Sequence, residues 1–140
     1  MAQRQLDPYL TFPGNCREAV RFYEQTLGAK LEHLSTFAES PLASTVPPEF
    51  GSRIMHARLL IDGQALMASD APPEMPIAPM SGFSLSLSYP TVEGAKQAFE
   101  SLAEGGQIVM PLAATFWAAA FGMVQDRFGV PWMIGSEMKS

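Results

Sequence analysis

The chain has 140 residues, of which 47% are hydrophobic and 16% are charged. That hydrophobic content is ample for the core of one compact unit or of two fused half-units. Nine basic and fourteen acidic residues give a net charge of −5, which argues against nucleic acid or an anionic membrane surface as a partner.

The first predicted elements are a short strand over residues 9–12 and a helix over about 15–27. The helix is indicated by apolar residues that recur at helical spacing, which are Ala19, Phe22, Tyr23, Thr26 and Leu27. Asn15, with Glu18 three residues later, predicts a capping box at the start of the helix, and Gly28 follows its end.

A strand over residues 29–37 and a long loop over residues 39–52 are predicted next. The loop contains three prolines and a glycine, Pro41, Pro47, Pro48 and Gly51, which disfavour regular structure. A loop of this length beside a pocket could act as a lid or could be a plain surface excursion.

Residues 54–70 predict a β-hairpin, because Asp62-Gly63 is a strong signal for a two-residue turn. In that register Arg58 pairs with Met67, and His56 pairs with Ser69. Alternation along the strands then separates two faces. The apolar face, expected to pack under helices, holds Met55, Ala57, Leu59, Ile61, Leu66 and Ala68. The mixed face holds His56, Arg58, Ala65, Met67 and Ser69.

A proline-rich linker over residues 72–81 precedes a second copy of these elements. Its helix, predicted over 92–104, repeats the apolar spacing of the first with Ala95, Ala98, Phe99, Leu102 and Ala103. Strands are predicted near 83–87, 107–112 and 116–124, followed by a turn at 126–129 and a strand to residue 134.

The repeated order βαβββ predicts an α+β fold with two tandem modules in a single domain over residues 1–140. Module 1 covers about 1–71 and module 2 about 82–140. Each module should form a curved mixed sheet backed by one helix, with the sheets arranged around a cavity.

Four observations concern location and assembly. Ile108–Val124 carries no charge, yet its proline and glycine favour two buried strands joined by a turn over a membrane span. Asp7 and Pro8 interrupt any N-terminal signal sequence. The lone cysteine, Cys16, excludes an internal disulfide and fits a reducing cytoplasm. The low charge content favours a homodimer.

Several sequence runs together resemble one family. They are Gly14-Asn15-Cys16-Arg17-Glu18-Ala19 with Phe22-Tyr23, Met55-His56-Ala57, Leu66-Met67-Ala68-Ser69-Asp70, Thr115-Phe116-Trp117 and Asp126-Arg127-Phe128-Gly129-Val130-Pro131-Trp132-Met133-Ile134. With them the chain resembles the vicinal-oxygen-chelate superfamily, which includes glyoxalases, bleomycin-resistance proteins and dioxygenases, and within it the PhnB-like branch. Proteins of this branch often carry a demethylubiquinone methyltransferase label, but the sequence has no glycine-rich nucleotide loop after its first strand.

The resemblance implies a metal site with one ligand from the first and the last strand of each module. Those positions fall near Pro8, on Met67, on Phe83 or Ser84, and on Met133. Proline and phenylalanine cannot bind a metal, and thioethers favour soft copper over the ions that this fold normally uses. We therefore predict no metal and no cofactor.

The candidate site in module 1 consists of His56, Arg58, Met67 and Ser69. The family position of Met67 implies that its face of the hairpin looks into the cavity. His56 opposite Ser69 could relay a proton, and Arg58 could hold a carboxylate or phosphate. The alternative is that His56 is a satisfied core histidine and that Arg58 reaches solvent.

In module 2 the corresponding wall is predicted to be small and apolar, with Ala120, Gly122, Val124, Pro131 and Met133. Such a wall would accept the tail of an amphiphilic ligand, and Trp117 could stack against the ligand. Outside this site, the helix dipole favours a thiolate at Cys16, Asp70 and Asp126 are expected to cap turns, and His33 is expected at the surface.

Two functions stay open at this point. The first is a small cytoplasmic protein that binds a small anionic or amphiphilic organic ligand in a metal-free cavity. The second is an enzyme of the same superfamily that uses His56 for acid–base chemistry or has a non-standard metal site. A structural dimer partner without a ligand is a third option.

Overall fold

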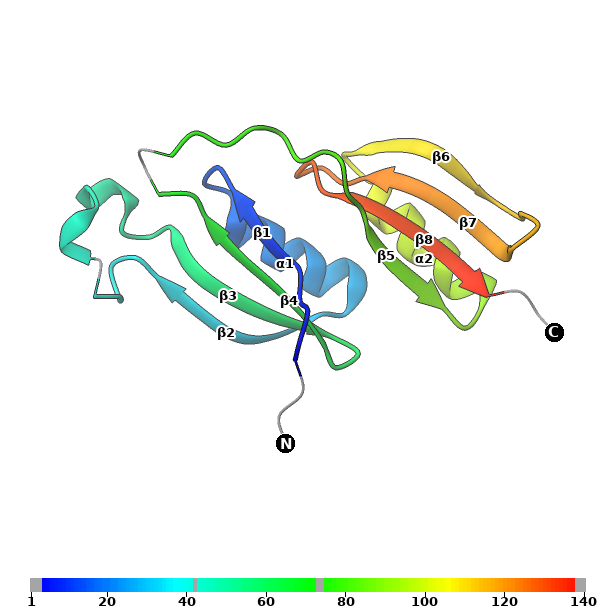
Figure 1. Cartoon of the computed structure of the whole chain (residues 1–140), viewed down its shortest axis with the longest axis horizontal. Helices are drawn as coiled ribbons and strands as arrows, with labels where there is room; N and C mark the ends of the chain where they lie inside the picture. The colour runs from blue at the N-terminus through cyan, green and yellow to red at the C-terminus, as the bar shows by residue number, and fades with distance from the viewer. Residues whose placement is uncertain (1–3, 42, 73–74, 138–140) are drawn as a thin grey trace. The chain divides into compact units, whose positions relative to one another are not determined.

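The computed structural model describes residues 4–41, 43–72 and 75–137, which form two compact units, Met1–Ala78 and Pro79–Ser140. Each unit contains a four-stranded mixed sheet backed by one helix (Figure 1). The boundary between the units falls inside the predicted linker, of which Pro73 and Glu74 lie outside the described residues. The α+β class and the two βαβββ modules are confirmed.

The first unit contains one helix and four strands. In chain order these are β1 (Tyr9–Phe12), α1 (Cys16–Leu27), β2 (Lys30–Thr36), β3 (Ile54–Ile61) and β4 (Gln64–Asp70). The strand order in the sheet is β1-β4-β3-β2, with β1 parallel to β4 and the other pairs antiparallel. The loop between β2 and β3 contains two short 3₁₀ turns, Ala43–Thr45 and Pro48–Phe50.

The second unit repeats this arrangement. Its elements are β5 (Leu85–Tyr89), α2 (Val92–Ala103), β6 (Gln107–Ala113), β7 (Ala118–Gln125) and β8 (Pro131–Glu137). The strand order is β5-β8-β7-β6, again with one parallel pair, β5 and β8. Both helices agree with their predicted bounds to within one residue, because the apolar stripe and the terminal glycine define each helix locally.

The core of each unit lies between its sheet and its helix. On β4 the side chains of Leu66, Ala68 and Asp70 are buried, whereas Met67 and Ser69 between them are half-buried. The predicted hairpin register is confirmed, since Arg58 pairs with Met67 and the turn residue Asp62 has a positive φ of 48°. One face of the sheet therefore packs under α1, and the other carries the mixed set of side chains.

The prediction that Met55 lies on the helix-facing side is wrong. Ser35 pairs with His56 while Thr36 pairs with Ile54, so β3 holds one extra residue at this point. Such a β-bulge interrupts the alternation of side chains along a strand. Ile54 is consequently fully buried, and Met55 is only half-buried.

The prediction that Ala120, Gly122 and Val124 share a face with Met133 is also wrong. Met133 pairs with Met123, and Val124 pairs with the buried Trp132. A Cβ atom added at Gly122 would lie 2.7 Å from Cε1 of Phe99 on α2. These small residues therefore pack under α2, because a register shift of one residue exchanges the two faces of a strand.

Ile108–Val124 forms two strands with a connection, as predicted, and none of the helices in the described residues is long and apolar enough to cross a membrane. However, β6 is exposed over most of its length, where a buried strand was predicted. The reason is its place at the edge of the sheet, which leaves one side without a neighbouring strand.

The predicted capping box at Asn15 is wrong, because its side chain makes no capping hydrogen bond and its ψ of 26° is not extended. The carboxylate of Asp70 replaces it. Oδ1 accepts the backbone N–H of Cys16 at 2.9 Å, and Oδ2 accepts the backbone N–H of Ile54 at 2.9 Å. Asp70 is buried, so this one side chain joins the start of α1, the start of β3 and the end of β4.

We predict that Asp70→Asn lowers the free energy of unfolding by about 1–3 kcal/mol in urea titrations, because an amide can accept one of these N–H groups but leaves the other buried and unpaired. Asp62→Asn is the matched control. Asp62 lies in the exposed turn at a positive φ, a conformation that asparagine also tolerates, so its stability should change little. Equal stability of the two variants would contradict the role given to Asp70.

Candidate functional site

The mixed side chains of the first unit form a row across all four strands of its sheet. Tyr9 on β1 lies beside Met67 on β4, Met67 pairs with Arg58 on β3, and Arg58 pairs with His33 on β2. Direct partners in neighbouring strands project from the same face. With His56 and Ser69 on the same face, we call this set the polar face. It comprises Tyr9, His33, His56, Arg58, Met67 and Ser69.

His56 lies at the centre of the polar face and is half-buried. Its Nδ1 atom is 3.1 Å from the hydroxyl oxygen of Tyr9, and the ring centroids of His56 and His33 are 5.8 Å apart. If the tyrosine hydroxyl donates to Nδ1, the neutral imidazole carries its proton on Nε2. The ring can then donate a hydrogen bond from Nε2 to a ligand oxygen.

The surroundings of His56 hold its pKa below the ordinary value. Partial burial is the main cause, and the nearby His33 and Arg58 add to it because each disfavours a second positive charge. The lowered pKa therefore favours the neutral form of His56 at pH 7. Because the ring is half-buried, His56 is not the core histidine of the alternative interpretation.

Arg58 already forms an ion pair within the first unit. Its Nε donates a hydrogen bond to Oε1 of Glu32 at 2.6 Å. The contact depends on a bulge in β2, where Leu31 pairs with Leu59 and His33 with Arg58, leaving Glu32 as the extra residue. Both side chains are partly exposed. The terminal nitrogens of the guanidinium make no hydrogen bond in the part of the chain that the structure describes.

The predicted relay from His56 to Ser69 is not present. Within residues 4–41, 43–72 and 75–137 the two side chains share no hydrogen bond, and the partner of His56 is Tyr9. Met67 is half-buried between Tyr9 and Arg58, and its backbone N–H donates to the carbonyl of Pro8. Met67 and Ser69 lie on the polar face with half-buried side chains, and their contact with a ligand stays a prediction.

The predicted thiolate at Cys16, in the first turn of α1, is not supported by its surroundings. The residue is completely buried, and burial together with the negative charge of Asp70 raises the pKa of its thiol to about 12. These effects exceed that of the helix dipole. Cys16 is a core residue and carries no thiolate at neutral pH.

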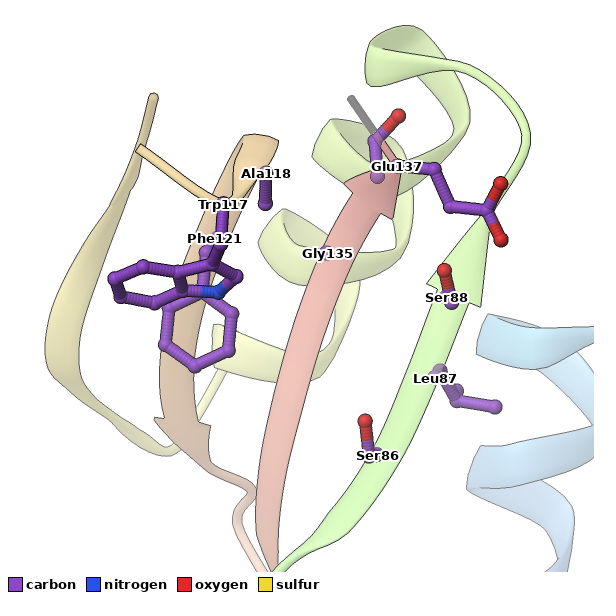
Figure 2. A pocket seen from close by; sticks show the side chains of 9 residues that line it. Ser86, Leu87, Ser88, Trp117, Ala118, Phe121, Gly135 and Glu137 are labelled. Atoms are coloured by element: carbon purple, nitrogen blue, oxygen red, sulfur yellow. The ribbon is translucent and has the colours of Figure 1, made fainter. Parts of the chain in front are cut away.

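The second unit contains a cavity of about 260 Å³ on the face of its sheet (Figure 2). Its lining residues are Ser86, Leu87, Ser88, Trp117, Ala118, Phe121, Gly135, Ser136 and Glu137. Trp117 lies at this cavity, and its stacking against a ligand stays a prediction. Met133 does not line it and instead lies between Met123 and Ser86 on the same sheet.

The positions that the family resemblance assigns to metal ligands do not fit a metal. Met67 lies beside Tyr9, and Met133 lies beside Ser86, so the residues opposite the methionines are hydroxyl-bearing. Ser86 replaces the predicted Phe83 or Ser84, which precede β5. In the described part of the chain, no group of three or more His, Cys, Asp or Glu side chains could hold a metal ion. A thioether with a neutral hydroxyl is a poor set for the hard or borderline ions of this fold.

Comparison with known proteins agrees with this architecture. The model of the Glyoxalase/Bleomycin resistance protein/Dioxygenase superfamily matches residues 5–134. The chain belongs to this superfamily.

Among its relatives is Protein YjdN of Escherichia coli, with 43% identity over 137 residues and 92% of each chain covered. The crystal structure of protein PA1353 from Pseudomonas aeruginosa has 47% identity and a TM-score of 0.89, covering 98% of this chain and 100% of that one. A protein from Bacillus cereus described as "Putative 3-demethylubiquinone-9 3-methyltransferase, PhnB protein" has 25% identity and a TM-score of 0.76, covering 95% and 99%. These similarities support the PhnB-like branch.

Sequence reasoning missed three members of the module 1 site. Tyr9 comes from a strand far from the hairpin in sequence, and only the parallel pairing of β1 with β4 brings it to His56. His33 is exposed, as predicted, but it lies next to His56. Glu32 reaches Arg58 through a bulge, for which no glycine or other local signal exists in β2.

The depressed pKa of His56 can be measured by NMR, because the chain has two histidines and therefore two sets of ring signals. We expect His56 to titrate below 6.5, and Arg58→Gln to raise its pKa by removing a nearby positive charge. Since the unfolded chain binds this proton more readily than the folded one, the depressed pKa should make stability fall as the pH drops through 6.5. A His56 pKa at or above 6.5 would contradict the described surroundings.

Proposed function

We propose that this protein binds a small organic molecule with an acidic or carbonyl group on the polar face of module 1. The observation that carries the proposal is the pairing of Tyr9 with Nδ1 of His56 beside Arg58. This arrangement offers an imidazole N–H and the terminal guanidinium N–H groups as donors for ligand oxygens. Met67 supplies an adaptable apolar surface next to them.

Glu32 sets the strength and the selectivity of this site. Its carboxylate occupies Nε of Arg58 and offsets the positive charge, although the side chain is half exposed. A ligand anion must therefore bind beside an existing ion pair, which weakens its attraction. The arrangement favours ligands in which a carboxylate or carbonyl is combined with an apolar body.

A second candidate function is catalysis by His56. Its neutral imidazole, oriented by Tyr9, could remove a proton from a bound substrate, because a general base must be unprotonated at the working pH. Binding without turnover would favour the first function, and turnover lost in His56→Gln would favour the second.

We do not extend the methyltransferase description of the Bacillus cereus protein to this chain. Residues 13–15, which separate β1 from α1, contain one glycine, Gly14, and α1 contains none, so the glycine-rich nucleotide loop is absent from this connection. The proposal is thus of a cytoplasmic, metal-free binding protein of this superfamily.

We also propose a homodimer. The low charge content agrees with an additional buried surface, and the edge strand β6 exposes Ile108, Val109 and Met110. Light scattering at micromolar concentration should give about twice the monomer mass of 15.2 kDa, and Val109→Lys should shift the equilibrium toward monomer. A wild-type monomer at this concentration would contradict the proposal.

Benzoate is a suitable probe of the polar face, and the ring signals of His56 report its binding by NMR. Arg58→Gln should weaken benzoate about tenfold or more by removing a charge-assisted hydrogen bond. Glu32→Gln should strengthen it, because the mutation removes a competing carboxylate from the same guanidinium.

The opposite signs of these two effects are the decisive result, since a general loss of structure would weaken binding in both variants. Glu24→Gln, on α1, is the control for the loss of one negative charge from the same unit. Benzoate that binds equally to wild type, Arg58→Gln and Glu32→Gln would overturn the proposed site.

A further inference from the structure

The cavity of module 2 has the composition of a site for a small organic cation. Among the described residues that line it, Glu137 is the one that carries a charge. No ion pair or hydrogen bond of its carboxylate is present within the described part of the chain. The unit Pro79–Ser140 is itself acidic, with three basic and five acidic residues, so the local field also favours a positive ligand.

Two aromatic side chains form one wall of the cavity. The rings of Trp117 and Phe121 meet edge to face, with centroids 5.5 Å apart, and Figure 2 shows them together on the β7 side of the cavity. Trp117 is 53% exposed, so its indole is available to a ligand. The face of an indole attracts cations through its quadrupole.

The position of Trp117 is fixed by its own backbone. The hydroxyl of Thr115 accepts the N–H groups of Trp117 and Ala118, at 3.3 and 3.0 Å, in a turn that precedes β7. This turn fixes the backbone of Trp117, and the ring contacts with Phe116 and Phe121 restrict the indole, which reduces the entropy lost on binding.

The other wall and the floor are small and polar. Ser86 and Ser88 of β5 present hydroxyls opposite the aromatic pair, and Gly135 of β8 lies between the two walls (Figure 2). Gly135 pairs with Phe121 and with Ser88, and its lack of a side chain leaves the floor open. Glu137 follows on the same strand with its backbone paired to Ala118, and its side chain extends toward β5, on the other side of the cavity from the aromatic pair (Figure 2).

We propose that this cavity binds a small quaternary or primary ammonium compound, with the cation between the indole of Trp117 and the carboxylate of Glu137. Ser86 and Ser88 would accept or donate hydrogen bonds to a polar substituent of the ligand. The volume of about 260 Å³ is just below the range of about 300–1,000 Å³ that is usual for drug-sized ligands, which selects a compact molecule. All the residues that line this site belong to the second unit.

The test compares choline with 3,3-dimethyl-1-butanol, its uncharged analogue of almost the same shape. Fluorescence reports binding, because Trp117 is exposed while Trp132, the other tryptophan, is buried. Choline should change the fluorescence in a saturable way, and the neutral analogue should bind more weakly. Equal affinity for the two compounds would overturn the proposal.

Glu137→Gln should weaken choline by about two- to fivefold, the effect expected for an exposed charge pair. Glu100→Gln, on α2 in the same unit and away from the cavity lining, removes the same charge and should leave the affinity unchanged. Equal losses in both variants would mean a general charge effect only, and would contradict the site.

Trp117→Leu removes the aromatic face, and choline binding to this variant is measured by ligand-observed NMR because its fluorescence signal is lost. We expect binding to disappear while the circular dichroism spectrum stays that of the wild type. Arg58→Gln should leave choline binding unchanged. Failure of the benzoate experiment with success of this one would refute the polar face alone, and the reverse result would refute the cation site alone.

Discussion

The buried carboxylate of Asp70 is the interaction on which the first module depends. Its two oxygens accept backbone N–H groups from Cys16 and Ile54, which belong to different elements. A buried carboxylate without such donors would be strongly destabilising. The contacts therefore fix α1 against the ends of β3 and β4, and with them the hairpin that carries His56 and Arg58.

Asp126 has the corresponding role in the second module. It caps the turn between β7 and β8, as predicted, by accepting the N–H groups of Phe128 and Val130, and its other oxygen accepts the indole N–H of Trp132 at 2.9 Å. This turn joins β7 to β8, with Gln125 paired to Pro131. The same register puts Met123 and Met133 on one face and leaves Gly135 as the floor of the cavity.

The chemistry of both modules comes from irregularities in otherwise regular sheets. The bulge at Glu32 brings its carboxylate to Arg58. The bulge near Met55 allows Ile54 to lie in the core and His56 to lie on the polar face. The turn at Thr115 positions Trp117. The result is one face with hydrogen-bond donors and one cavity with an aromatic and acidic lining.

The sequence by itself determined both helices, the Asp62-Gly63 hairpin with its register, and the repeat of the two modules, because short-range spacing and turn residues specify these features. It also placed His56, Arg58, Met67 and Ser69 on one face. Only the tertiary structure decided that Tyr9 and His33 join His56, since those contacts depend on strand pairing across long stretches of chain. The register of β7 and β8 and the Asp70 cap were likewise decided there, because packing against the helices selects one register among several that the local pattern allows.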